Sequence, residues 1–277
     1  MNLVGLGLCS SAVRSWPSER VVDEARRVGF QGVEWEVGGG ATHIPFADID
    51  KRARACFELS ERAGLAVPCL SAEGALSILD AGTRRGLVAA AAAGDCRLVR
   101  MFAPPVDPHV EPERQLSTLR RALEAHAGEF HEHRVSLLIE LSEETLIPSP
   151  ELFARVAVDL DRDAVGVVYD PANMLVEGNL PPWYALSLLG DLAKHVHIKN
   201  EIFVRQAVGW APQIVGIEDG MLDWPLVAAA LEQVGYADWI CIDHLSGPET
   251  REQLVEEHRT AVRVLGFSDT QAKGKIR

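Results

Sequence analysis

The chain has 277 residues, of which 47% are hydrophobic and 24% charged, with a formal net charge of −13. This length suits one large domain or two small ones, and the composition is that of an ordinary globular protein. The acidic excess argues against a nucleic-acid partner, because phosphate backbones bind basic surfaces, and no apolar run approaches the roughly 20 residues of a membrane span.

The amino-terminal stretch "MNLVGLGLCSSAVRS" has no basic leader before its apolar residues, so we interpret it as a first strand and not as a signal peptide. The five cysteines show no CxxC spacing, and most stand in or beside predicted strands: Cys9, Cys56, Cys69, Cys96 and Cys241. An odd number of cysteines in apolar surroundings is typical of reduced thiols. These features favour a cytoplasmic protein.

Eight short apolar runs recur along the chain, each followed by a helical pattern. They cover residues 3–8, 32–37, 66–71, 96–102, 135–140, 165–170, 195–200 and 239–244. Most start about 30 residues after the previous one, which is the length of a strand, a helix and two short connections. The sequence therefore predicts eight βα units.

The segments between these strands have helix signals at their ends. Residues 18–29 begin with a serine cap and end with glycine, while 112–130 and 223–235 have proline near the start and apolar residues at helical spacing. Alternating strands and helices form parallel sheets with right-handed crossovers. We therefore predict a single (β/α)₈ TIM barrel over residues 1–277, with 267–277 as a flexible tail.

An open, doubly wound sheet is the alternative fold. It usually has fewer strands and a glycine-rich phosphate turn after the first strand. The first strand here continues into "GLGLCSS", which matches neither GxGxxG nor GxxxxGK[ST]. The closed barrel is favoured for this reason, and such barrels place their chemistry at the carboxyl ends of the strands.

Potential metal ligands stand at the carboxyl ends of the last four predicted strands: Glu140, Asp170, His197 and Asp243. A single carboxylate in such a place is more often the cap of the next helix, but four ligands on successive strands are harder to explain in that way. Three clustered carboxylates need a compensating positive charge. The mostly oxygen set suits Mg²⁺ or Mn²⁺, with Co²⁺ or Zn²⁺ as alternatives, so the sequence predicts one divalent metal ion.

Four segments of the second half carry recognisable motifs: "LLIE" (137–140), "GVVYDPAN" (166–173), "HVHIKN" (195–200) and the stretch 216–243. They resemble the second half of the xylose isomerase-like TIM barrels, while the first half is similar only in its βα rhythm. That superfamily includes sugar isomerases and epimerases, inosose-converting enzymes and the endonuclease IV group. The resemblance implies one divalent ion, most often manganese in the epimerases, held by Glu140, Asp170, His197 and Asp243.

The sequence departs from that family at three positions. Asp243 stands where glutamate is usual, Asn173 where a histidine often touches the substrate, and Leu146 where ketose 3-epimerases have a glutamate. Asparagine can hydrogen-bond a hydroxyl but carries no proton at neutral pH. These departures argue against a ketose 3-epimerase in particular.

A divalent ion next to a substrate carbonyl acidifies the adjacent C–H, because it stabilises the enediolate that forms. By resemblance to the epimerases, Glu140 and Asp243 would be the acid and base that remove and return the proton. We predict an isomerase or epimerase of a keto-sugar, sugar phosphate or related polyol. The alternative is a dehydratase of the inosose or 3-dehydroshikimate type, and a non-catalytic barrel or an endonuclease IV-like nuclease ranks lower.

Several further side chains are candidates for contact with a small carbohydrate substrate: Glu34, Arg100, Asn173, Lys199 and Arg205. Each has a plainer interpretation: Glu34 could be a buried or capping carboxylate, Lys199 a lysine that extends to solvent, and Arg205 a surface arginine. His195 lies deeper than His197 on the same strand face, and we interpret it as a hydrogen-bonded core histidine. The sequence leaves homo-oligomerisation open.

Overall fold

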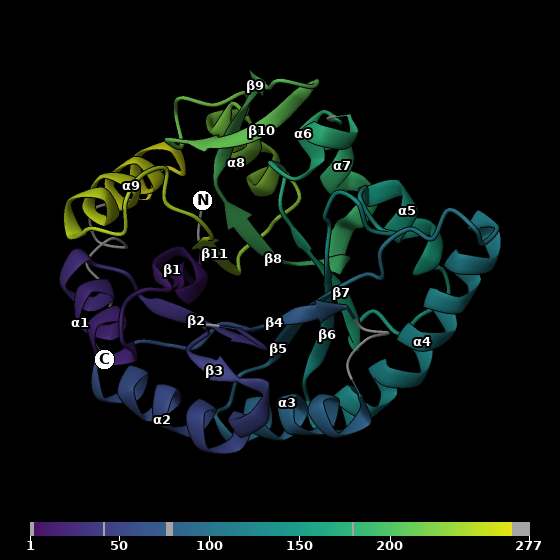
Figure 1. Cartoon of the computed structure of the whole chain (residues 1–277), viewed down its shortest axis with the longest axis horizontal. Coiled ribbons are helices and arrows are strands. Elements are labelled where there is room, and N and C mark those ends of the chain that lie inside the picture. Colours follow the sequence, from purple (N-terminus) through teal and green to yellow (C-terminus); the bar gives the residue numbers. More distant parts are fainter. Residues whose placement is uncertain (1–2, 41, 76–79, 179, 268–277) are drawn as a thin grey trace.

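The computed structural model describes residues 3–40, 42–75, 80–178 and 180–267. It confirms a closed barrel of eight parallel strands with helices between them, a single (β/α)₈ TIM barrel (Figure 1). The barrel strands are β1 (Gly5–Cys9), β2 (Gly32–Gly38), β4 (Leu70–Ala75), β5 (Leu98–Phe102), β6 (Ser136–Glu140), β7 (Val165–Tyr169), β8 (Ala193–Ile198) and β11 (Trp239–Ile242). The sheet closes because β1 pairs with both β2 and β11.

Helices form an outer ring around the barrel (Figure 1). They are α1 (Ser18–Val28), α2 (Ile49–Arg62), α3 (Ala81–Ala93), α4 (Pro112–Glu132), α5 (Pro150–Val156), α6 (Met174–Glu177), α7 (Pro182–Leu189), α8 (Trp224–Gln233) and α9 (Arg251–Val264). Helix α1 ends at Gly29, whose φ of 113° is a conformation that glycine adopts without strain. None of the described helices is both long and apolar enough to cross a membrane.

The two faces of the barrel strands differ in chemistry. Side chains alternate along a strand, so in β6 Leu137 and Ile139 belong to the main hydrophobic core beneath the helices, while Leu138 and Glu140 have the opposite orientation. On the strand face that points into the barrel, β2 carries Glu34 and β8 carries His197, and both side chains are completely buried. The interior of the barrel therefore holds buried polar side chains beside apolar ones such as Leu138, and the main apolar core lies between strands and helices.

The third barrel strand starts later than predicted. We expected it at 66–71, but β4 begins at Leu70 and runs to Ala75. Pro68 has no backbone N–H to give to a neighbouring strand, and Ala66 makes only an isolated bridge to Gly32. A two-residue strand, β3 (Ile44–Pro45), extends the sheet beside β2 and was not predicted.

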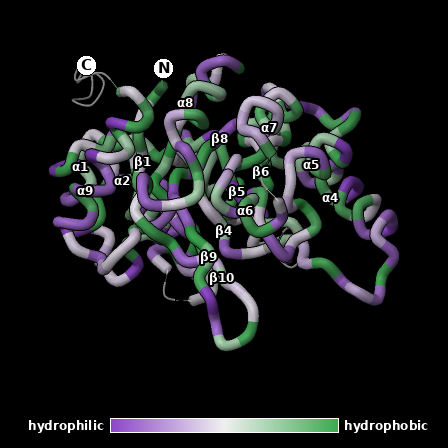
Figure 2. Tube along the Cα trace, turned by 90° about the horizontal axis from the view of Figure 1, so that it is seen from above, coloured by the Kyte–Doolittle hydropathy of each residue, from purple (hydrophilic) through white to green (hydrophobic). Residues whose placement is uncertain are grey.

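A hairpin that was not predicted follows β8. Strands β9 (Asn200–Arg205) and β10 (Trp210–Val215) pair in antiparallel fashion, and the hairpin projects from the body of the barrel (Figure 2). The Asn200 side chain fixes its base: Nδ2 donates to the carbonyls of Ile217 (2.7 Å) and Leu222 (2.9 Å), and Oδ1 accepts from Leu222 N (3.0 Å). A side chain at Gly220 would collide with Asn200, so glycine permits this close approach.

The end of the described chain still belongs to the domain. Phe267 is half-buried against the core, and its N–H donates to the carbonyl of Val262 (3.0 Å). The rest of the predicted tail, 268–277, lies outside the described residues.

Candidate active site at the mouth of the barrel

The four predicted metal ligands come together at the carboxyl ends of the strands, the end that we call the mouth. Their potential ligand atoms all lie within 4.8 Å of one another, and all four residues are buried: Glu140, Asp170, His197 and Asp243. The Nδ1 atom of His197 is 3.8 Å from Glu140 Oε1 and 3.8 Å from Asp243 Oδ1. We call these four residues the ligand cluster.

The donor set of the ligand cluster fits a divalent cation. His197 Nδ1 is buried and has no hydrogen-bond partner, although it faces two carboxylates. A buried polar atom without a partner is costly, and an imidazole nitrogen among carboxylate oxygens is a usual metal environment. The residue types and their spacing therefore fit a divalent ion at this place.

Two cations already offset part of the negative charge in the cluster. The Lys199 ammonium is 2.8 Å from Asp170 Oδ2 and 3.2 Å from Asp243 Oδ2, and Arg100 Nε is 3.0 Å from Glu140 Oε2. Burial raises the pKa of Asp170 despite this lysine. For Asp243 burial acts in the same direction, but His244 and Lys199 outweigh it and hold its pKa well below the usual value.

Asn173 also reaches the ligand cluster, as predicted for a residue near the site. Its Nδ2 donates to Glu140 Oε1 (3.1 Å) and to the Leu141 carbonyl (3.0 Å). The amide thus orients the Glu140 carboxylate. His244 Nδ1 lies 2.6 Å from Asp243 Oδ2 and orients that carboxylate in the same way.

Glu34 lies beneath the cluster, in the closed interior of the barrel. Its carboxylate bonds to His195 Nε2 (2.7 Å), His197 Nε2 (3.1 Å) and the Ser71 hydroxyl. Burial alone would raise the pKa of Glu34, but the two imidazoles outweigh it and hold this pKa well below the usual value. A His197 Nε2–H that donates to Glu34 leaves the Nδ1 lone pair free to face the cluster.

These contacts change the interpretation of Glu34 and Arg205 and confirm that of His195. Glu34 is 0% exposed and is covered by the cluster side chains, so its contacts are with protein groups. His195 is confirmed as a hydrogen-bonded core histidine. Arg205 is not brought to the cluster: it is exposed on β9, with its guanidinium 5.7 Å from the centre of the Trp210 ring.

Sequence reasoning missed other polar groups at the mouth. Arg14, which follows the turn Ser10–Val13, hydrogen-bonds Glu36 and lies 2.9 Å from Glu73 Oε1. Glu201 starts the hairpin and is 8% exposed, and burial raises its pKa. Alternation along the strand predicts that Glu36 shares a face with Glu34, whereas the positions of Arg14 and Glu201 depend on a turn and a hairpin with no clear pattern.

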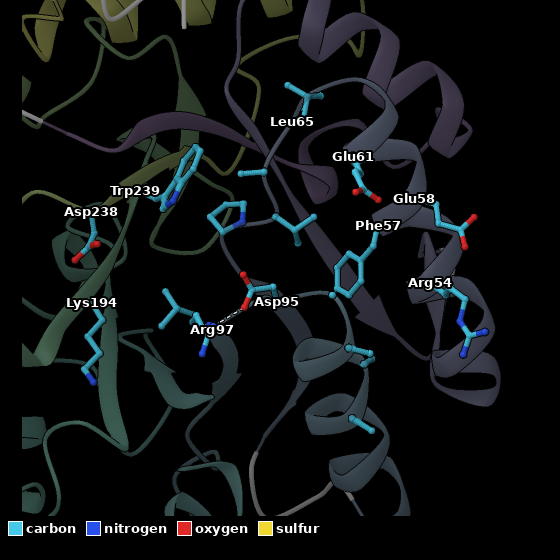
Figure 3. Close-up of a pocket in the computed structure, with 18 of the residues that line it drawn as sticks. Arg54, Phe57, Glu58, Glu61, Leu65, Asp95, Arg97, Lys194, Asp238 and Trp239 are labelled. Carbon is cyan, nitrogen blue, oxygen red and sulfur yellow. Dashed lines mark hydrogen bonds and ion pairs between the residues drawn. The ribbon is translucent and has the colours of Figure 1, made fainter. Parts of the chain in front are cut away.

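A cavity is present at the other end of the barrel, which we call the floor. It has a volume of about 1380 Å³ and lies between α2, α3 and the starts of the strands (Figure 3). Its walls include Phe57, Trp239 and the exposed ion pair of Arg97 with Asp95. Because it lies at the opposite end from the ligand cluster, we do not assign the active site to it.

Comparison with known structures agrees with this fold. A xylose isomerase-like TIM barrel protein from Mycobacterium smegmatis, in complex with magnesium, matches with a TM-score of 0.68 and 19% identity, covering 95% of this chain and 92% of that one. The probable 3-DHS dehydratase AsbF from Bacillus anthracis matches with a TM-score of 0.74 and 15% identity, and the match covers 95% of this chain and 98% of that one. A D-psicose 3-epimerase in the presence of D-fructose matches with a TM-score of 0.71 and 15% identity, and the match covers 95% of this chain and 100% of that one.

At these identities the likeness shows the fold alone, and no curated protein matches the sequence. A family model adds a direct assignment. The model of the xylose isomerase-like TIM barrels matches residues 22–264, which is most of the chain. The protein therefore belongs to the xylose isomerase-like TIM barrel family.

Proposed function

We propose that this protein is a divalent-metal-dependent isomerase or epimerase of a keto-sugar or related polyol. The observation that carries the proposal is the ligand cluster, with four potential ligand atoms within 4.8 Å and an unpartnered His197 Nδ1 among them. Glu140, Asp170, His197 and Asp243 would hold the ion, with Mn²⁺ as the expected metal. A bound divalent ion would polarise the substrate carbonyl and so acidify the neighbouring C–H.

The side chains of this site would then position and move a proton. Glu140 and Asp243 are the proposed acid and base, since their carboxylates come from different sides of the barrel, β6 and β11. Asn173 and His244 keep these carboxylates oriented. Lys199 is the donor proposed to stabilise a developing oxyanion, and Arg100 holds Glu140 in its charged form.

A dehydratase remains the second candidate, because the fold is also that of the probable 3-DHS dehydratase AsbF. The same proton abstraction leads to dehydration when a β-hydroxyl leaves. The two reactions differ in their products: loss of water creates an absorbing enone or enol, whereas isomerisation does not. Ultraviolet spectra of reaction mixtures therefore separate the candidates.

Elemental analysis tests the metal part of the proposal. The parent protein is expected to bind about one equivalent of Mn²⁺, as one cluster holds one ion, and His197→Ala is expected to lose it. His133→Ala, at the exposed end of α4, is the matched control and should keep the metal. A parent that fails to bind added Mn²⁺, Mg²⁺, Co²⁺ or Zn²⁺ would overturn the proposal.

Incorporation of solvent deuterium tests the reaction. The Mn²⁺-loaded parent is expected to exchange the C–H next to the carbonyl of its keto-sugar, followed by NMR. Glu140→Gln removes a charged ligand and the proposed proton carrier, so exchange should fall by about a hundredfold or more. Exchange that persists in Glu140→Gln would remove this residue from the proton transfer.

A further inference from the structure

A second polar group lies at the mouth, outside the ligand cluster. It consists of Glu36 at the end of β2, Glu73 in β4 and Arg14, whose guanidinium bonds to both carboxylates. Glu36 is 3% exposed, and its Oε2 is buried without a hydrogen-bond partner. A side chain at Gly38 would collide with the Glu73 carboxylate, so this strand end is shaped to admit it. We call the three residues the β2–β4 subsite.

The strand register sets the distance between this subsite and the ligand cluster. Glu36 pairs with Ser71, and Ser71 pairs with Arg100, whose Nε is 3.0 Å from Glu140. Two interstrand spacings amount to about 10 Å. A sugar held at the ligand cluster would therefore extend its far end toward Glu36 and Glu73.

The β2–β4 subsite has fewer positive partners than the rest of the mouth. Seven carboxylates lie at or just beneath the mouth: Glu34, Glu36, Glu73, Glu140, Asp170, Asp243 and Glu201. The ammonium and guanidinium groups beside them belong to Arg14, Arg100 and Lys199, and each is ion-paired with one or two of these carboxylates. Imidazoles also lie against two of the carboxylates, His195 and His197 against Glu34 and His244 against Asp243. At the β2–β4 subsite itself, Glu36 and Glu73 share the one guanidinium of Arg14, so this subsite keeps a negative excess. The exposed Arg205 makes its contact with Trp210 on the hairpin.

We infer that the substrate is an uncharged polyhydroxy carbonyl compound, and that Glu36 and Glu73 accept hydrogen bonds from its hydroxyls far from the reacting carbon. This inference rests on the proposed function and narrows it. The free Oε2 of Glu36 is an acceptor and suits a hydroxyl donor. A phosphate or carboxylate at the same place would be repelled by two carboxylates. The inference therefore disfavours sugar phosphates and 3-dehydroshikimate, which is a carboxylate.

The test compares D-ketohexoses with their 6-phosphates on the Mn²⁺-loaded protein. Calorimetry gives the dissociation constants, and deuterium uptake from solvent reports exchange next to the carbonyl. We expect the phosphorylated sugars to bind about tenfold more weakly or worse at low salt. Added NaCl should narrow the difference, because salt screens repulsion between charges near the surface.

Charge-neutral variants locate the effect. Glu36→Gln and Glu73→Gln each remove one negative charge from the subsite, so discrimination against phosphate should shrink several-fold while the bound Mn²⁺ is kept. Glu58→Gln is the matched control. Glu58 is exposed on α2 at the floor, so this substitution should leave the discrimination between free and phosphorylated sugars unchanged.

The outcomes separate this inference from the proposed function. Tighter binding of the phosphorylated sugars, or unchanged discrimination in Glu36→Gln and Glu73→Gln, would overturn the inference and leave a metal-dependent isomerase intact. Failure of every free and phosphorylated ketohexose to bind or exchange, with Mn²⁺ present at the site, would contradict the proposed function and the inference with it.

Discussion

Both ends of the barrel carry charged side chains, but they hold them in opposite ways. At the mouth, Lys199 bonds to Asp170 and Asp243, three buried residues from different parts of the sequence. At the floor, Arg97 pairs with Asp95 two residues away, and both are exposed. Buried pairs are sensitive to the loss of one partner, whereas exposed pairs contribute little. The ion pairs of Lys199 at the mouth thus form only when the barrel closes, whereas the Arg97–Asp95 pair at the floor joins residues that are already neighbours in the sequence.

The largest loss of stability is expected on substitution of Glu34, which lies beneath the mouth. Glu34→Ala leaves the buried His195 and His197 without their shared acceptor and opens a cavity. We expect a loss of about 4 kcal/mol in the free energy of unfolding, measured with urea in the presence of a chelator. Glu58→Ala on the exposed face of α2 is the control, and equal losses in the two variants would contradict the contrast between the two ends.

Lys199→Met tests the buried charge at the mouth directly, because it removes the cation and keeps most of the side-chain volume. Asp170 and Asp243 then lose their shared partner, and we expect the metal-free protein to lose about 3 kcal/mol of stability. Added Mn²⁺ should recover more stability in this variant than in the parent, since the ion takes over the compensation. An equal response of both proteins to Mn²⁺ in thermal unfolding would argue against a shared electrostatic role.

The outer ring offers an intermediate case in Glu24 of α1, whose carboxylate bonds to Arg251 of α9 (Arg251 Nε to Glu24 Oε2, 2.6 Å). The hydrogen bond from Arg251 lowers the pKa of Glu24. Its stabilising effect is therefore present at neutral pH and lost as the pH falls through the lowered pKa. Glu24→Gln should cost about 1 kcal/mol at pH 7.

Urea unfolding at several pH values checks this expectation. The difference between the parent and Glu24→Gln should shrink on acidification below pH about 4, where a glutamate in the unfolded chain is protonated. A difference that stays constant from pH 7 to pH 3 would mean that the carboxylate charge is not responsible.

The smallest effect is expected at the floor. Arg97→Ala removes an exposed pair with Asp95, and the free energy of unfolding should change by no more than about 0.5 kcal/mol. Bound Mn²⁺ should be unaffected. A loss comparable with that of Lys199→Met would show that the floor also depends on its charges.

The sequence was most informative where one regular unit repeats. Apolar runs about 30 residues apart predicted the eight barrel strands, and the polar residues that end the last four runs predicted the ligand cluster. Both inferences hold because parallel strands bring their carboxyl ends to one rim. The roles of the cluster residues in binding a metal and moving a proton stay predictions.

The parts that were missed depend on local geometry or on distant partners. No periodic pattern marks the turn that carries Arg14 to Glu36 and Glu73. The substrate role predicted for Glu34 came from the resemblance to family members with a glutamate on this strand. Depth along the strand decides whether a side chain meets solvent or other core residues, and Glu34 is buried beneath the cluster. Residues 200–215 show no strict alternation, because Ile202, Phe203 and Val204 are consecutive apolar residues, so the hairpin was not predicted.

The Asn200 amide, which fixes the return of the hairpin through Ile217 and Leu222, has a consequence for the length of the hairpin. Because the anchor lies at the base, residues inserted or deleted at the tip, 206–209, leave the registers of β8 and β11 unchanged. Length variation there is nearly neutral for folding. The hairpin tip can therefore change its length and shape while the barrel strands that carry the ligand cluster keep their positions.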